Sequence, residues 1–193
     1  MPRTTGVVLA GGQGSRMGGV DKGLQPFRGK PMVAHAIERL APQVGELLIN
    51  ANRNPEAYAQ FGYRVIADEI EGFAGPLAGF ERGLAHASGD LVVTVPCDSP
   101  FLPADLVARL REALERADAD LAVAKTGDQA HPVFSLMRRG VHASLVQFLS
   151  SGQRKIDKWY AGLQVIEVAF DDEAEAFLNI NTREELASLE PRA

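Results

Sequence analysis

The stretch Gly6-Val-Val-Leu-Ala-Gly-Gly-Gln-Gly-Ser-Arg-Met-Gly-Gly-Val-Asp-Lys22 joins a short apolar run to a loop that is rich in glycine. Residues 6–10 are continuously apolar, which is typical of a strand buried on both faces of a sheet. Glycines at positions 11, 12, 14, 18 and 19 allow sharp turns and let backbone N–H groups approach phosphate oxygens. Arg16 and Lys22 add positive charge. The stretch therefore predicts an α/β fold whose first strand leads into a phosphate-binding loop.

Two common phosphate loops do not fit this stretch. Counted from Gly12, a dinucleotide-binding fingerprint needs glycine at position 17, where Met17 stands. The Walker pattern needs Lys followed by Ser or Thr, but Lys30 is followed by Pro31. The remaining alternative is a flexible turn that is only rich in glycine, and the cations at positions 16 and 22 disfavour it.

Predicted strands and helices alternate along the chain. Apolar runs predict strands at 6–10, 47–51, 64–66, 91–96, 121–124, 133–136 and 164–168. Helical spacing predicts helices at 32–40, 77–87, 103–116, 141–149 and 183–189. Pro103 suits the first turn of the third helix, and Thr182 with Glu185 has capping-box spacing for the last. We expect one α/β domain over residues 1–193, Rossmann-like, with a mainly parallel sheet flanked by helices.

Ligands of such sheets bind beyond the carboxyl ends of the strands. The segments that follow four of the predicted strands are 10–22, 50–53, Asp68 and 97–98. Asp98 lies between Pro96 and Pro100, which stiffen the backbone, and a carboxylate at this edge can hold Mg2+. The alternative for Asp98 is a helix cap or an Asx turn.

Composition and charge narrow the classes of function. Hydrophobic residues make up 46% and charged residues 23%, which is ordinary for a folded globular protein. The formal net charge of −5 disfavours nucleic acid and anionic membranes as partners, and no apolar run is long enough to span a bilayer. The single cysteine, Cys97, excludes an internal disulfide and indicates a reducing compartment. Since no signal-peptide pattern is found, we expect a cytoplasmic protein.

The loop motif Leu-Ala-Gly-Gly-x-Gly-Ser-Arg-Met-Gly-Gly-x-Asp-Lys closely resembles the signature of the molybdenum cofactor guanylyltransferases, a branch of the nucleotide-diphospho-sugar transferase-like nucleotidyltransferases. Later motifs similar to that family's follow in the same order: Asn50-Ala-Asn-Arg53, Asp68, Gly75-Pro-Leu-Ala-Gly79, Pro96-Cys-Asp-Ser-Pro100, His131-Pro132 and Asn179-Ile-Asn-Thr182. The resemblance implies transfer of GMP from GTP to the terminal phosphate of molybdopterin-bound molybdenum cofactor, with Mg2+ as cofactor and pyrophosphate as product.

The resemblance also implies roles for individual residues. The implied catalytic residues are Arg16, Lys22 and Asp98, and the implied metal ligands are Asp98 and Asn181. The implied nucleotide-binding residues are Leu9, Ala10, Gly11, Gly12, Lys22, Asn50, Asp68 and Asp98. Whether Asp68 or Asn50 reads the base stays open, because a carboxylate can accept from guanine N1–H and the exocyclic amine, while an amide can donate and accept. For Asn181 the alternative is a turn residue ahead of a helix cap.

The second substrate and the base leave alternatives open. Arg154 and Lys155 lie in a polar stretch and can meet the phosphate of the second substrate, or can belong to a solvated helix start. Ala10-Gly11-Gly12 favours guanine, because related cytidylyltransferases for the same cofactor usually carry Ala-Ala-Gly. A transferase that uses CTP or a sugar phosphate is one rival, and a non-catalytic, nucleotide-dependent cofactor-binding module is another. Expected partners are GTP, molybdopterin-bound molybdenum cofactor, cofactor-synthesis proteins and acceptor molybdoenzymes.

Cys97 and His131 are set apart from the predicted site. Cys97 stands beside Asp98, but a small residue at the end of a buried strand more often packs than reacts, so we expect packing. The histidines share no metal-ligand spacing, and the role of His131 is open although it matches a family position.

Overall fold

Strand β1 (Thr4–Leu9) lies inside the sheet between two parallel partners. In this computed structural model, which describes residues 3–11, 20–70 and 75–178, β1 pairs with β4 (Glu46–Asn50) and β6 (Leu91–Pro96). Val7 and Val8 are fully buried in two different core clusters, because successive side chains of a strand point to opposite faces. The prediction of a first strand buried on both faces is therefore confirmed.

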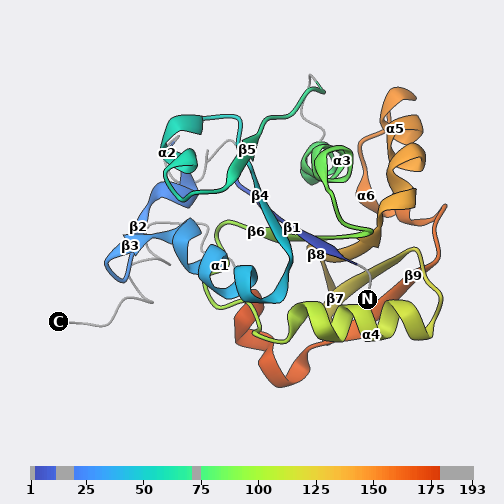
Figure 1. Cartoon of the computed structure of the whole chain (residues 1–193). Helices are drawn as coiled ribbons and strands as arrows, with labels where there is room; N and C mark the ends of the chain where they lie inside the picture. Colours follow the sequence, from blue (N-terminus) through green and yellow to red (C-terminus); the bar gives the residue numbers. More distant parts are fainter. Residues whose placement is uncertain (1–2, 12–19, 71–74, 179–193) are drawn as a thin grey trace.

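The sheet has seven strands in the order β5-β4-β1-β6-β8-β7-β9 (Figure 1). The remaining strands are β5 (Arg64–Ile66), β7 (Leu121–Thr126), β8 (Gln129–Arg138) and β9 (Val165–Ala169). β8 runs antiparallel to its neighbours β6 and β7, and every other neighbouring pair in this sheet is parallel. The predicted fold class, a mainly parallel α/β sheet, is confirmed. A two-residue hairpin of β2 (Pro26–Phe27) and β3 (Lys30–Pro31) lies outside this sheet.

Helices cover both faces of the sheet (Figure 1). Helices α1 (Met32–Leu40) and α4 (Leu106–Arg116) pack on one face. Helices α3 (Pro76–His86), α5 (His142–Ser150) and α6 (Ile156–Tyr160) pack on the other. Short helix α2 is Pro55–Ala59, and 3-10 turns are Lys22–Leu24, Ala41–Gln43, Arg139–Val141 and Asp171–Phe177. Among the described helices, none is long and apolar enough to cross a membrane.

Some predicted boundaries differ from the structure. Helix α4 begins at Leu106 rather than at Pro103, because Pro103 lies in a preceding turn where its carbonyl accepts the Leu106 N–H at 3.3 Å. β8 extends well beyond the predicted 133–136, since pairing with β7 continues through polar residues. Helices α2 and α6 were not predicted. The helix predicted at 183–189 and its cap lie outside the described residues.

The strand directions bring the expected site segments to one edge. β1, β4, β5 and β6 run in the same direction, so the residues that follow them meet at their carboxyl ends. The antiparallel β8 starts at this edge, so His131 lies near it as well. The edge predicted to bind a ligand is thus built from four strand ends.

Candidate functional site at the carboxyl edge of the sheet

Asp98 and Lys22 form an ion pair beyond the end of β6. Asp98 Oδ2 lies 3.7 Å from Lys22 Nζ, and their side chains are 11% and 23% exposed. The Cys97 N–H donates to the Leu9 carbonyl at 3.1 Å, which extends the β1–β6 pairing up to the residue before Asp98. A carboxylate at a fixed strand end therefore faces the ammonium of the predicted phosphate loop.

Asp68 is the centre of a second polar cluster at the same edge. Its carboxylate accepts from Asn50 Nδ2 at Oδ1 and from Asn52 Nδ2 at Oδ2, both at 2.9 Å. The Asp68 N–H donates to Asn52 Oδ1 at 2.7 Å, so both ends of the Asn52 amide are engaged by the same residue. Asn52 Nδ2 also donates to the Gly11 carbonyl at 3.4 Å. The two amides hold the carboxylate in one orientation beside the first strand.

Asn50 is the buried member of this cluster, with 2% exposure. Its side chain also donates to the Ile66 carbonyl at 3.3 Å, and its own carbonyl accepts the Ala10 N–H at 2.7 Å. Helix α3 reaches this amide through Gly79, where a β-carbon would lie 2.8 Å from Asn50 Oδ1 and 2.7 Å from Leu9 Cδ2. A side chain at position 79 would therefore displace Asn50 or Leu9.

The predicted nucleotide-binding residues that the structure describes are thus close to one another. Leu9 ends β1 and Ala10 and Gly11 follow it, and all three contact the Asn50 to Asp68 cluster or helix α3. Asp98 and Lys22 form the neighbouring ion pair. The predicted residues Gly12, Arg16 and Asn181 lie outside the described residues.

Arg154 and Lys155, predicted to meet the second substrate, lie between α5 and α6. The Arg154 guanidinium donates to the carbonyls of Leu149 and Gln153, each at 2.8 Å, so it caps the carboxyl end of α5. Lys155 is exposed and precedes the first residue of α6, in agreement with the alternative of a solvated helix start. Their contact with a second substrate stays a prediction.

Comparison with known proteins decides the family. The profile of the MobA-like NTP transferase domain matches residues 6–166. A molybdenum cofactor guanylyltransferase of Cupriavidus necator is 55% identical over 193 residues, covering 97% of this chain and 96% of the relative. The chain belongs to the molybdenum cofactor guanylyltransferase family. Another such enzyme, from Shewanella amazonensis, is 52% identical over 187 residues, or 97% of this chain and 95% of its own. The resemblance predicted from the motifs is confirmed.

Solved structures agree with this guanylyltransferase family. Molybdopterin-guanine dinucleotide biosynthesis protein A from Archaeoglobus fulgidus superposes with a TM-score of 0.81 at 25% identity, covering 97% of this chain and 96% of that one. A 4-diphosphocytidyl-2C-methyl-D-erythritol synthase from Anaerococcus prevotii shares the fold at a TM-score of 0.74 and 12% identity, covering 96% and 93%. The fold is therefore that of nucleotidyltransferases.

The donor set of this guanylyltransferase family member suits a hard cation bound mainly by substrate. Among the described residues, no three His, Cys, Asp or Glu side chains form a metal-binding group. Asp98 offers a carboxylate that is only 11% exposed beyond the end of β6. Mg2+ is commonly bound by one or two carboxylates together with water and substrate phosphates. Asp98 fits this kind of site. The described residues do not form a metal site that is closed by protein ligands.

The surroundings of Cys97 and His131 indicate structural roles for both side chains. Burial raises the pKa of the Cys97 thiol, which keeps it protonated and a poor nucleophile. His131 stacks on Phe177 with ring centroids 4.9 Å apart, and its Nε2 lies 2.7 Å from Thr126 Oγ1. Burial lowers the pKa of His131, so the ring is neutral at pH 7. The expected packing of Cys97 is confirmed.

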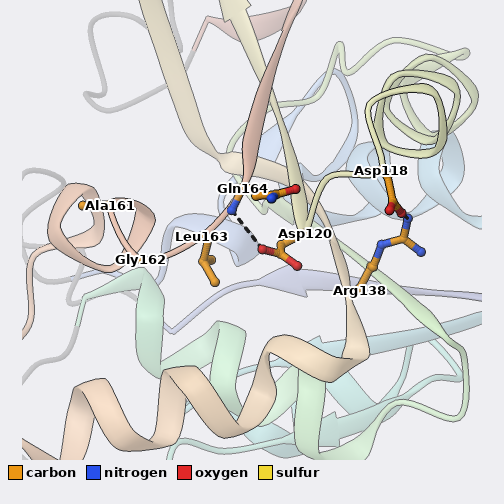
Figure 2. A pocket seen from close by; sticks show the side chains of 7 residues that line it. All are labelled: Asp118, Asp120, Arg138, Ala161, Gly162, Leu163 and Gln164. Atoms are coloured by element: carbon orange, nitrogen blue, oxygen red, sulfur yellow. Dashed lines mark hydrogen bonds and ion pairs between the residues drawn. The ribbon is translucent and has the colours of Figure 1, made fainter.

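The cavity shown in Figure 2 lies at the other edge of the sheet. It has a volume of about 740 Å³ and is lined by Asp118, Asp120, Arg138, Ala161, Gly162, Leu163 and Gln164. These residues lie where β7 and β9 begin and β8 ends, opposite the strand ends that carry Asp68 and Asp98. The cavity is therefore separate from the candidate site of the guanylyltransferase.

Asn52 and Gly79 belong to the candidate site but were not assigned roles from the sequence. Asn52 was quoted only as part of a motif, and its bonds to Asp68 and Gly11 depend on how β1, β4 and β5 pair. Gly79 falls inside the helix predicted at 77–87, but its close approach to Asn50 was not predicted. Two signals in the sequence pointed to these residues. Asn50 and Asn52 stand two residues apart at the end of one predicted strand, and Gly79 lies inside a predicted apolar helix.

Proposed function

We propose that this chain transfers GMP from GTP to the terminal phosphate of molybdopterin-bound molybdenum cofactor and releases pyrophosphate. The proposal rests on one observation: two groups lie at the same edge of the sheet. They are the Lys22–Asp98 ion pair and the Asp68 carboxylate, which accepts hydrogen bonds from two amide side chains. The first suits a triphosphate with its metal, and the second suits a base that donates hydrogen bonds. Relatives of more than 50% identity named for this activity support it.

The reaction needs charge neutralisation and positioning more than acid–base chemistry. An oxygen of the cofactor's terminal phosphate attacks the α-phosphorus of GTP. A new P–O bond forms as the bond from the α-phosphorus to the bridging oxygen breaks, and pyrophosphate leaves. Because the attacking phosphate is already ionised, no general base is required. We assign Lys22, together with Arg16 and backbone N–H groups of the loop, to stabilising the negative charge on the phosphates.

We assign guanine recognition to Asp68, with Asn50 and Asn52 orienting it. The carboxylate can accept hydrogen bonds from guanine N1–H and the exocyclic amine. Adenine presents an acceptor at N1 and would face the carboxylate unfavourably. Both amides already donate to the Asp68 oxygens at 2.9 Å, so the carboxylate is held in one orientation for this task.

We assign the metal to Mg2+ at Asp98, with Asn181 as the second protein ligand. When bound, the ion would neutralise triphosphate charge and orient the α-phosphate. Arg154 and Lys155 remain our proposed contacts for the second substrate's phosphate, and residues 1–193 our proposed single domain. Cofactor-synthesis proteins and acceptor molybdoenzymes are the proposed protein partners.

The direct test is turnover of purified protein with molybdenum cofactor, Mg2+ and one nucleoside triphosphate at a time. We expect pyrophosphate release and a guanylated cofactor with GTP, and much slower turnover with CTP, UTP and ATP. A cytidylated product at the higher rate would support the CTP-specific rival. Nucleotide-dependent thermal stabilisation with no pyrophosphate would support the non-catalytic module, since ligand binding alone raises stability.

A further inference from the structure

Asp21, the residue before Lys22, is held by two side chains from the chain segment that follows β4. The Tyr58 hydroxyl donates to Asp21 Oδ1. Asn54 Nδ2 donates to Asp21 Oδ2 at 3.1 Å. Each carboxylate oxygen therefore has its own donor, and the orientation of Asp21 is fixed from the side of α2.

Tyr58 is well suited to act as a permanent donor. Its side chain is fully buried in the core on the α1 and α4 face, so its ring position is set by packing. Burial, with an added effect of the hydrogen bond to Asp21, raises the pKa of the hydroxyl, so it stays protonated at neutral pH. The hydroxyl is thus a fixed point presented by the core.

The backbone on the other side of Lys22 also lies against this hydroxyl. Gly23 is buried, and a β-carbon built on it would overlap the Tyr58 hydroxyl oxygen. Lys22 therefore lies between a neighbour bonded to Tyr58 and a neighbour packed on Tyr58. A lysine side chain is long and flexible, so the position of its backbone sets the range within which its ammonium can lie.

The same segment also contacts the chain at Gly11, through the Asn52 amide. Residues 52–58 thus contact the predicted phosphate loop, residues 10–22, at Gly11 and again at Asp21.

We propose that Tyr58 is a positioning residue, which acts through Asp21 and the close approach to Gly23 to hold Lys22 beside Asp98. This inference rests on the proposed function, because it assigns Lys22 to the triphosphate. Tyr58 does not touch substrate in this assignment. Its effect on catalysis passes entirely through the position of Lys22.

The test is a double-mutant cycle between Tyr58→Phe and Lys22→Met, measured as initial rates of pyrophosphate release over a range of Mg·GTP concentrations with saturating molybdenum cofactor. We expect Tyr58→Phe to lower kcat about tenfold with a smaller change in KM for GTP, because a small displacement of a catalytic group lowers the rate steeply. In the Lys22→Met background the same change should cost no further activity, since residues that act as one unit are non-additive. Tyr63→Phe, which removes the same atom from a nearby partly buried tyrosine, is the matched control.

The outcomes separate the possible failures. Wild-type kcat in Tyr58→Phe, or an equal fold loss in both backgrounds, would overturn the positioning role and leave a structural one. If Tyr58→Phe does not fold, Asn54→Ala is used instead, because it removes the other donor to Asp21 at an exposed site. It must lower kcat in the wild-type background and cause no further decrease in the Lys22→Met background. An inactive wild-type protein would instead contradict the proposed function.

Discussion

The two edges of the sheet both carry carboxylates and a basic side chain, but they use them differently. At the carboxyl edge, Asp98 faces Lys22, and the Asp68 carboxylate is held by amide side chains. At the opposite edge, Asp120 accepts the backbone N–H of Gln164 at 2.9 Å (Figure 2). There Arg138 donates to the Ala119 carbonyl at 2.8 Å and to Asp118 at 3.1 Å.

The volume of a cavity therefore does not identify the candidate functional site in this protein. The polar side chains that line the cavity of about 740 Å³ form hydrogen bonds with backbone groups near the strand ends. The carboxyl edge instead gathers side chains from β4, β5 and β6 and from the loop after β1 around two carboxylates. Interactions between side chains of different strand ends, rather than volume, indicate a place built for a ligand.

Asp98→Ala should have the largest effect on activity, because it removes a carboxylate of the carboxyl edge. We expect kcat/KM for guanylyl transfer to fall by at least about a hundredfold, as is typical when one electrostatic partner of a charged transition state is lost. Steady-state pyrophosphate release measures the effect, and circular dichroism checks that the protein stays folded. Asp118→Ala, at the exposed opposite edge, is the matched control and should keep full activity. Full activity of Asp98→Ala would remove the metal and catalytic assignment.

Asn52→Ala tests whether the amides of the carboxyl edge orient the Asp68 carboxylate. The variant loses one donor to the Asp68 carboxylate, and hydrogen bonds to charged groups contribute about 1.5–3 kcal/mol, so we expect kcat/KM for GTP to fall by at least about tenfold. Inosine triphosphate lacks the exocyclic amine, so wild type should prefer GTP over it, and the variant should prefer GTP less. The ratio of the two kcat/KM values is insensitive to the amount of folded enzyme. An unchanged ratio would refute the role of Asn52 in orienting Asp68.

Arg138→Ala should have the smallest effect on activity. It removes the bonds to Ala119 and Asp118, so we expect the free energy of unfolding to fall by about 1 kcal/mol and Tm by roughly 2–4 °C. The value of kcat/KM should stay within about twofold of wild type because the cavity at that edge lies away from the proposed chemistry. Thermal unfolding and turnover of the same preparation test both parts. A large loss of turnover with normal stability would connect the opposite edge to the reaction.

The strand ends were predictable because local pattern and topology agree there. Continuous apolar runs mark strands buried on both faces, and parallel pairing then brings the residues after each run to one edge. Ala10, Asn50, Asp68 and Asp98 follow from this rule, and all lie where it places them. The family resemblance added the chemistry that the topology does not specify.

The remaining features depend on contacts between segments distant in sequence. Helix α2 has only five residues, too few for a helical period, so burial of Tyr58 left no sequence signal. The bonds of Asn52 depend on the alignment of β1, β4 and β5. The antiparallel direction of β8 is equally hidden, since its apolar part resembles that of a parallel strand. Pro103 suggested a helix start but lies in the turn before Leu106.

The antiparallel placement of β8 also bears on the order of folding. β7 and β8 are joined by a tight turn and pair along their length, so their contacts are local and can form early. Thr4 pairs with Leu91 and Thr5 with Glu46, so the pairings of β1 must close long loops and are expected to form late. The carboxyl edge formed by β1, β4 and β6 would then be assembled after the hairpin of β7 and β8. Nascent or partly folded chains would contain secondary structure well before they could bind GTP.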